Sequence, residues 1–217
     1  VAKMMLDVTS PNTSKIASNL IKSINTENLS ASQKKAISIL KNWKGNFEIQ
    51  EVGPVIYNRL VYEFQKNTFA DEMGKGYNQF VNTPFIEKVL PVQAVKEYSI
   101  WWDNVATKGV IETKQEIVTS SFEKAFNFLE NQLGSDVENW TWERVVSVEY
   151  KHPIGEVALL RKFFNVGPFV TNGGDQVINN QIYNIDSTGY YKVKAGPSTR
   201  RVVDFSDVEN SLAIIPT

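Results

Sequence analysis

The chain has 217 residues, with 23 basic and 24 acidic side chains, 42% apolar residues and 12% aromatic residues, a balance typical of one large or two small globular domains. A net charge of -1 provides no field to hold a phosphate backbone, so nucleic acid is not an expected partner. No apolar run approaches the roughly 18 residues of a bilayer span, and the mean hydropathy is -0.27, so no membrane anchoring is expected. With no Cys and one His, disulfides and Cys nucleophiles are excluded, and zinc or His-rich metal sites nearly so.

Both ends of the chain are abrupt. Residue 1 is Val, and no basic segment followed by an apolar stretch and a cleavage site comes after it. The last residues, 212–217, are apolar and carry no polar tail. We therefore expect this chain to be a piece of a longer protein.

The first half of the chain has the apolar spacing of helices. Thr13 and Ser14 precede an apolar stripe from Ile16 to Ile24. Ser30 and Gln33 have the spacing of a capping box, and this second helix should end with Gly45 at its C′ position.

Three further segments complete the predicted helical half. Residues 55–69 keep helical periodicity, and residues 120–133 form an amphipathic pattern that Gly134 closes. Residues 87–102 are interrupted by Pro91, which should end one short helix and lie in the first turn of the next.

The second half is typical of strands. β-branched and aromatic residues gather in segments separated by Gly, Asp, Ser and Pro, namely 145–150, 177–185, 190–193, 201–205 and 212–215. Residues 1–135 should thus be mainly helical and residues 140–217 mainly strands. Helices first and strands afterwards predict an α+β fold with antiparallel strands, and not a βαβ sheet.

Residue types alone indicate no self-sufficient active site. His152 precedes Pro153 at a strand end, where a turn role is favoured, and no G-x-S-x-G elbow exists for a Ser-His-Asp triad. The Gly173-Gly174-Asp175 sequence comes before a strand and not before a helix, which favours a turn over a phosphate cradle.

Aromatic and acidic pairs also have plain explanations. Trp101-Trp102 and Trp140-x-Trp142 could line a ligand pocket, but core packing is favoured. Asp71-Glu72 and Asp207-x-Glu209 lack the spacing of a calcium loop, so solvated surface is the expectation.

A series of short motifs, in one shared order over most of the chain, resembles the β-subunit of the penicillin acylase family of N-terminal nucleophile hydrolases. The motifs in the first two thirds are Met5-Leu6-Asp7-Val8, residues 36–45 (AISILKNWKG), residues 67–72 (NTFADE), Trp102-Asp103-Asn104, and residues 133–142 (LGSDVENWTW). The more specific block follows with Tyr150-Lys151-His152-Pro153-Ile154, Gly167-Pro168-Phe169, Gly173-Gly174-Asp175 and residues 196–204 (GPSTRRVVD). One departure is that Glu143 and Val146 stand where many relatives have Gly and His.

The resemblance implies a partial αββα sandwich and the hydrolysis of a linear side-chain amide to an acid and an amine. In the family the first residue of the β-chain is a Ser whose hydroxyl attacks the amide carbonyl while its own α-amine acts as base. Val1 has no hydroxyl, so the nucleophile should lie upstream in the parent, and this segment alone should be inactive.

Two family roles fall on this segment by resemblance. Asn179 would donate its amide to the oxyanion of the tetrahedral intermediate, with Asn180 as the alternative under a one-residue slip. Strand neighbours face opposite sides, so only one of them could point into the site. Arg200 would hold this Asn and the amine end of the nucleophile by charge-assisted hydrogen bonds, with Arg201 as the alternative.

The resemblance also implies partners and a compartment. The remaining α and β chains of the acylase and a small-molecule amide are the expected partners, and the periplasm is the expected location. No cofactor is expected in the segment, although the resemblance implies a structural calcium in the parent, with Asp186 as the candidate contributor from this segment. The rival hypothesis is a non-catalytic α+β module that binds a partner through exposed apolar surface.

Overall fold

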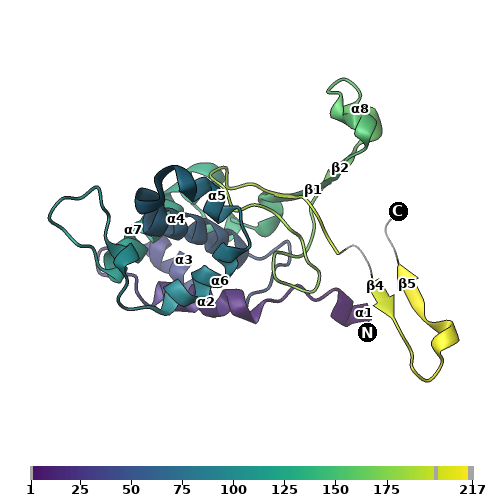
Figure 1. Ribbon diagram of the computed structural model, residues 1–217, viewed down its shortest axis with the longest axis horizontal. Coiled ribbons are helices and arrows are strands. Elements are labelled where there is room, and N and C mark those ends of the chain that lie inside the picture. The colour runs from purple at the N-terminus through teal and green to yellow at the C-terminus, as the bar shows by residue number, and fades with distance from the viewer. Residues whose placement is uncertain (1, 198–199, 215–217) are drawn as a thin grey trace.

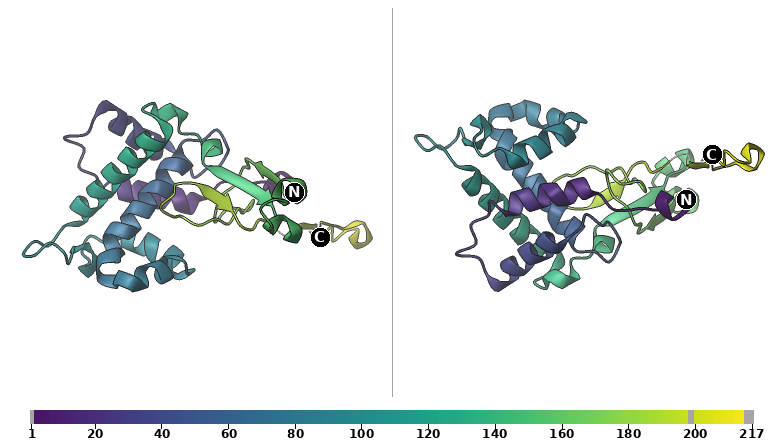
Figure 2. Two further views of the ribbon diagram at one scale, coloured as in Figure 1. Left: turned by 90° about the horizontal axis from the view of Figure 1, so that it is seen from above. Right: turned by 90° about the horizontal axis from the view of Figure 1, so that it is seen from below.

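The computed structural model describes residues 2–197 and 200–214. Most of its helices gather at one end and its strands extend from the other, as Figures 1 and 2 show. The α-helices are α1 (Ala2–Met5), α2 (Pro11–Ile21), α3 (Ala31–Asn42), α4 (Gly53–Met73), α5 (Tyr77–Val81), α6 (Phe85–Val95), α7 (Lys114–Leu133) and α8 (Arg161–Phe164). Short 3₁₀ helices lie at Gly74–Gly76, Ile100–Trp102, Val137–Asn139, Trp142–Arg144, Pro153–Glu156 and Val208–Asn210. The strands are β1 (Val146–Tyr150), β2 (Val166–Phe169), β3 (Tyr191–Val193), β4 (Arg200–Val202) and β5 (Leu212–Ile214). The predicted α+β class is confirmed.

Helix α4 forms the centre of the helical body. It is apolar or enclosed on nearly every side, and Val55, Leu60 and Phe64 are completely buried. A helix without a polar face must be surrounded by other elements. Helix α7 covers it with a stripe that includes Phe122 and Leu129, and α3 and α6 belong to the same helical body (Figure 1).

Local capping explains where two helices begin. Ser30 and Gln33 exchange the two hydrogen bonds of a capping box, at 2.8 and 3.2 Å, as predicted for α3. Thr113 and Glu116 make a second capping box, so α7 starts at Lys114, six residues before the predicted start at 120. Gly134, with φ +94°, ends α7 as predicted.

Two predictions about helix ends are wrong. Pro91 lies inside a single helix, α6, because Ile86, Leu90 and Ala94 are buried against the core and their packing outweighs the missing backbone donor. Gly45 is not at C′, since α3 ends at Asn42 with Trp43 as its C-cap. Its φ of +85° instead lets the chain pass the Ser10 carbonyl, where a Cβ would lie 2.0 Å from the oxygen.

The sheet is mixed. Its order is β2-β1-β3, with β1 antiparallel to β2 and parallel to β3 through the pair Val146 and Tyr191. The prediction of antiparallel strands is therefore wrong for β1 and β3, because the long excursion through 151–190 lets the chain return in the same direction. Strands β4 and β5 pair separately as an antiparallel hairpin.

The strand predicted at 177–185 does not form. The chain there bends, and only an isolated bridge between Ile182 and Ala195 remains. Strand β4 spans 200–202 and so covers only 201 and 202 of the predicted 201–205, and residue 215 of the last predicted strand lies outside the described residues. The αββα sandwich stays a prediction, since the described strands make one three-stranded sheet and one hairpin. Within the same ranges no helix combines the length and the apolar character that a bilayer span requires.

A buried ion pair lies within α4, and its Arg59 also contacts later parts of the chain. The Arg59 guanidinium contacts the Glu63 carboxylate, and each residue is only 5% exposed. Arg59 also lies 3.4 Å from the centre of the Phe128 ring of α7 and donates to the Ser187 carbonyl at 3.1 Å. These contacts fix α7 and the loop before β3 against α4.

Substitution of Glu63 by Ala should therefore destabilise the protein strongly. Removing one partner of a buried pair leaves an uncompensated charge and costs about 3–5 kcal/mol. The matched control is Glu138→Ala in the exposed pair with Lys35, whose side chains are 67% and 44% exposed, and whose loss should cost under about 1 kcal/mol. Urea unfolding measures both, and equal losses would contradict the role given to the buried pair.

Candidate functional site

The double glycine forms a tight turn against the aromatic core. Gly173 has φ +113°, its N–H donates to the Phe47 carbonyl at 2.8 Å, and its carbonyl accepts from the Trp142 indole at 3.1 Å. Gly174 lies on the Phe47 ring, where a Cβ would come within 2.4 Å of a ring carbon. Only glycine fits either position, so the turn is held in one place.

Asn179 is fixed at both its backbone and its side chain. Its backbone N–H donates to the Asp7 carbonyl at 2.8 Å. Its side-chain Nδ2 donates to the Asn172 carbonyl at 3.2 Å, and its Oδ1 accepts from Arg200 at 2.7 Å. The residue lies in the bend that replaces the predicted strand, and the bend is held by these contacts instead of by a ladder.

Arg200 begins β4 and reaches back to the start of the chain. Its Nη2 donates to Asn179 Oδ1, and its Nη1 donates to the Met5 carbonyl at 2.5 Å.

The next residue, Arg201, is exposed on the same strand. Asn180, beside Asn179, has a buried Oδ1 without a hydrogen-bond partner among the described residues. The structure thus brings Asn179 and Arg200 together by a hydrogen bond. Among the described residues, neither the Asn180 side chain nor the Arg201 guanidinium takes part in that contact. Ser198 and Thr199 of the motif before Arg200 lie outside the described residues.

This contact determines the direction of the Asn179 amide. A guanidinium only donates hydrogen bonds, so the group facing it must be the amide oxygen and the NH₂ must face away. One of the two amide hydrogens is used by the Asn172 carbonyl, and the other can serve a further acceptor. A donor polarised by a cation in this way is suited to bind a developing negative charge on oxygen.

The other candidates from the sequence have structural roles. The Nδ1 of His152 accepts from the Ile154 N–H at 3.2 Å, so the imidazole stabilises a turn as predicted. Trp102, Trp140 and Trp142 are at most 3% exposed and fill the core. Trp101 packs on Phe69, with ring centres 5.3 Å apart.

In each of the two acidic clusters, one aspartate accepts a hydrogen bond from a nearby group of the chain. Asp71 accepts from the Val105 N–H at 2.9 Å, and Asp207 accepts from the Asn210 amide at 2.5 Å. The pKa of Glu72 is raised to about 7, mainly because its carboxyl is partly removed from water and secondly because it lies beside the Asp71 carboxyl. The Asp186 carboxylate accepts from Thr188 at 2.9 and 2.5 Å. No group of three or more His, Cys, Asp or Glu side chains with the arrangement of a metal site occurs among the described residues.

Sequence reasoning missed the part played by backbone carbonyls. Met5, Asp7 and Asn172 orient the pair through main-chain oxygens, which any residue type would supply. The side chain of Asn172 also accepts from the Ile49 N–H at 2.8 Å, which links the site to the aromatic core. The only available signal was the position of Met5 to Asp7 inside one of the resembling motifs.

Comparison with known proteins places the chain in a family. The family described as Penicillin amidase matches the chain over residues 1–217. The chain belongs to the penicillin amidase family. It is 23% identical over 182 residues to "Acyl-homoserine lactone acylase QuiP" of Pseudomonas fluorescens (strain Pf0-1), a match that covers 81% of this chain and 21% of that protein. The protein of the same name from Pseudomonas aeruginosa PAO1 is 20% identical over 199 residues, with 83% of this chain and 23% of that protein covered. The chain thus spans about a fifth of the length of these curated relatives.

Substitution of Gly173 by Ala should disturb the site. The new Cβ would lie 2.3 Å from the Asn179 carbonyl oxygen at a φ of +113°, so Asn179 must shift. The expected cost is about 1–3 kcal/mol in the free energy of unfolding. Gly76→Ala is the matched control, because nothing lies within 4 Å of that position, and it should change stability by less than about 0.5 kcal/mol. Chemical denaturation tests both, and a neutral Gly173→Ala variant would contradict the proposed constraint.

Proposed function

We propose that this chain is a segment of a longer amide hydrolase of the acylase type, within which Asn179 supplies an oxyanion donor and Arg200 positions it. The single observation that carries the proposal is the hydrogen bond from Arg200 to Asn179 Oδ1, which turns the amide NH₂ away from the guanidinium. Membership of the penicillin amidase family and the acylase relatives support the same reaction class.

The chemistry assigned to the pair is stabilisation of charge. When a hydroxyl adds to an amide carbonyl, the carbonyl oxygen becomes an anion, and a fixed N–H donor lowers the energy of that state. Asn179 would donate its second amide hydrogen to this oxygen. Arg200 would keep the amide in place and strengthen it as a donor, because its cation withdraws electron density through Oδ1. The nucleophile expected for the family, a Ser whose own α-amine acts as base, would come from another part of the parent.

The substrate class follows from the relatives. Two of them are named as acylases of acyl-homoserine lactones, compounds in which an acyl chain is joined to an amine by a linear amide. We propose that the parent hydrolyses such an amide to an acid and an amine in the periplasm, together with its remaining chains. The segment alone would be inactive. Any calcium in the parent would need carboxylates beyond Asp186, and no step above depends on it.

The rival binding module rests on exposed apolar surface. Leu159 and Phe163 are each 82% exposed at the tip of the arm formed by β1, β2 and α8 (Figure 1). A segment of a larger enzyme would also expose such residues, so they do not separate the two hypotheses. The contact between Asn179 and Arg200 favours the hydrolase.

In the full-length protein, Asn179→Ala should reduce kcat by roughly 10²–10³ with little change in KM, the usual loss for one oxyanion donor. Steady-state hydrolysis of an acyl-homoserine lactone measures it. Asn78→Ala on α5, an exposed Asn outside the site, is the control and should keep full activity. Turnover of Asn179→Ala at the wild-type rate would refute the assignment.

Arg200→Lys tests the positioning role separately. A Lys ammonium keeps the charge but cannot present two donors in a fixed plane to Met5 and Asn179. We expect a loss of about tenfold or more in kcat, whereas Arg201→Lys should be silent. A fully active Arg200→Lys variant would show that the planar fork is not needed.

A further inference from the structure

A cavity beside the loop that carries Asn179 is a second potential site. A cavity of about 360 Å³ is lined mainly by α4, by the start of α6 with the residues before it, and by the loop 175–185. Neither Asn179 nor Arg200 lines it. Its volume suits a small organic molecule.

Two buried polar side chains line this cavity without a protein partner. Gln65 is 6% exposed and Tyr57 is 4% exposed, yet no hydrogen bond joins the Gln65 amide or the Tyr57 hydroxyl to another described residue. Their polar atoms are not completely enclosed by protein, and both residues belong to the lining of the cavity. Burial raises the pKa of Tyr57 above its usual range, which keeps the hydroxyl protonated. Buried polar groups of this kind need a hydrogen-bond partner, which a ligand or water in the cavity would supply.

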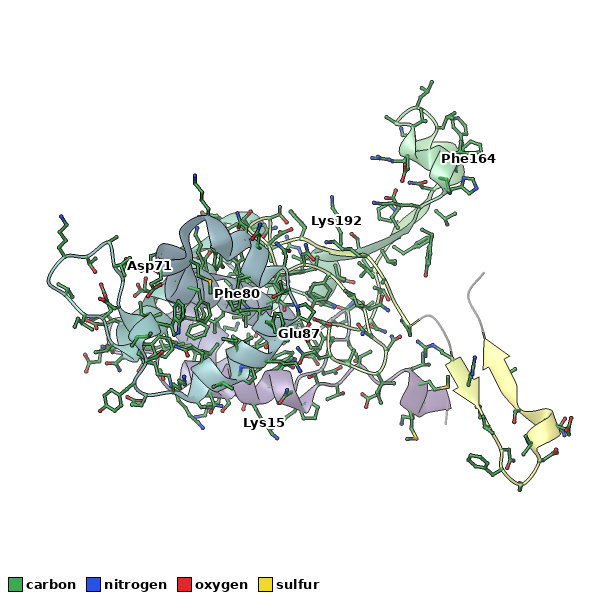
Figure 3. All side chains as sticks on the ribbon, in the orientation of Figure 1. Lys15, Asp71, Phe80, Glu87, Phe164 and Lys192 are labelled. Atoms are coloured by element: carbon green, nitrogen blue, oxygen red, sulfur yellow. The ribbon has the colours of Figure 1, made fainter. Side chains whose placement is uncertain are left out.

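The charge of the cavity is negative. Asp175 from the loop and Glu87 from α6, which is labelled in Figure 3, both line it, and no Lys, Arg or His does so among the described residues. Burial, followed by the carboxylate of Glu87, raises the pKa of Asp175. Because the lining has two carboxyl groups and no positively charged side chain among the described residues, an anionic ligand is disfavoured and a cationic one is favoured.

Aromatic rings complete the lining. Phe47, Tyr57 and Tyr183 border the same space, and the Tyr183 hydroxyl accepts from the Asn58 amide at 3.1 Å. Aromatic faces attract organic cations, while amide and hydroxyl oxygens accept hydrogen bonds from an ammonium group. A metal ion has less support, because the described residues contain no group of three or more His, Cys, Asp or Glu side chains in a metal-site arrangement.

We propose that the cavity between α4, α6 and the loop 175–185 binds a small primary ammonium ion, with Gln65 and Asp175 recognising its N–H groups. The aromatic rings would hold the organic part of the ligand. This site does not depend on the hydrolytic role proposed above.

Isothermal titration of the full-length protein with three probes of one shape tests the proposal. Benzylammonium should bind, benzyl alcohol should bind at least tenfold more weakly, and benzoate should not bind. Gln65→Leu and Asp175→Asn should each weaken benzylammonium about tenfold, since each removes one acceptor or charge. Glu123→Gln on α7, an exposed carboxylate outside the cavity, should bind as the wild type.

The two lining variants provide two independent tests, with thermal unfolding to verify that each is folded. The Asn179→Ala variant should bind benzylammonium normally even if it no longer hydrolyses its substrate, which separates this proposal from the proposed function. Equal binding of the three probes, or no binding of benzylammonium, would overturn the proposal and leave a water-filled cavity only. Loss of binding in Asn179→Ala would also overturn it, because the site would then belong to the catalytic cleft.

Discussion

One guanidinium joins the parts of the chain that form the candidate site. Arg200 donates to the carbonyl of Met5, 195 positions earlier, and to the amide oxygen of Asn179, 21 positions earlier. Its donors lie in a rigid plane, so the two acceptors must keep a fixed separation and angle. The direction of the Asn179 amide, and hence its suitability as a donor to an oxyanion, follows from this one contact. The N-terminal segment matters for the same reason, because the Met5 carbonyl accepts from Arg200 and the Asp7 carbonyl accepts from the Asn179 N–H.

The aromatic core beneath the site gives this contact a fixed base. Phe47 and Trp142 pack with ring centres 5.8 Å apart, and both hydrogen-bond to Gly173, one through its carbonyl and the other through its indole. Trp142 also packs against Tyr191 of β3, which ties the same core to the sheet. Rigid positioning of a donor is what distinguishes catalytic stabilisation from an ordinary solvent-exposed amide. The double glycine is required because side chains there would collide with Phe47 or with the Asn179 backbone.

The sequence predicted elements whose signals are local. The capping box of Ser30 and Gln33 and the closing Gly134 were readable because a few neighbouring residues determine them. Pro91 was misread, since the burial of Leu90 and its neighbours in α6 is a tertiary effect. The segment 177–185 has strand composition but lacks a strand partner along its length, so it bends. For the site, Asn179 and Arg200 came from a resemblance, whereas the carbonyls that orient them carry no sequence signal.

The central claim is that the free N–H of Asn179 faces the oxygen that becomes negative during hydrolysis. The most direct measurement is a crystal structure of the full-length protein with an alkylboronic acid bound covalently to its nucleophile, which places a tetrahedral oxygen in the oxyanion position. We predict an Asn179 Nδ2 to oxygen distance of about 2.7–3.1 Å with Arg200 still bound to Oδ1. An amide turned away from that oxygen, or an Arg200 separated from Asn179, would contradict the account.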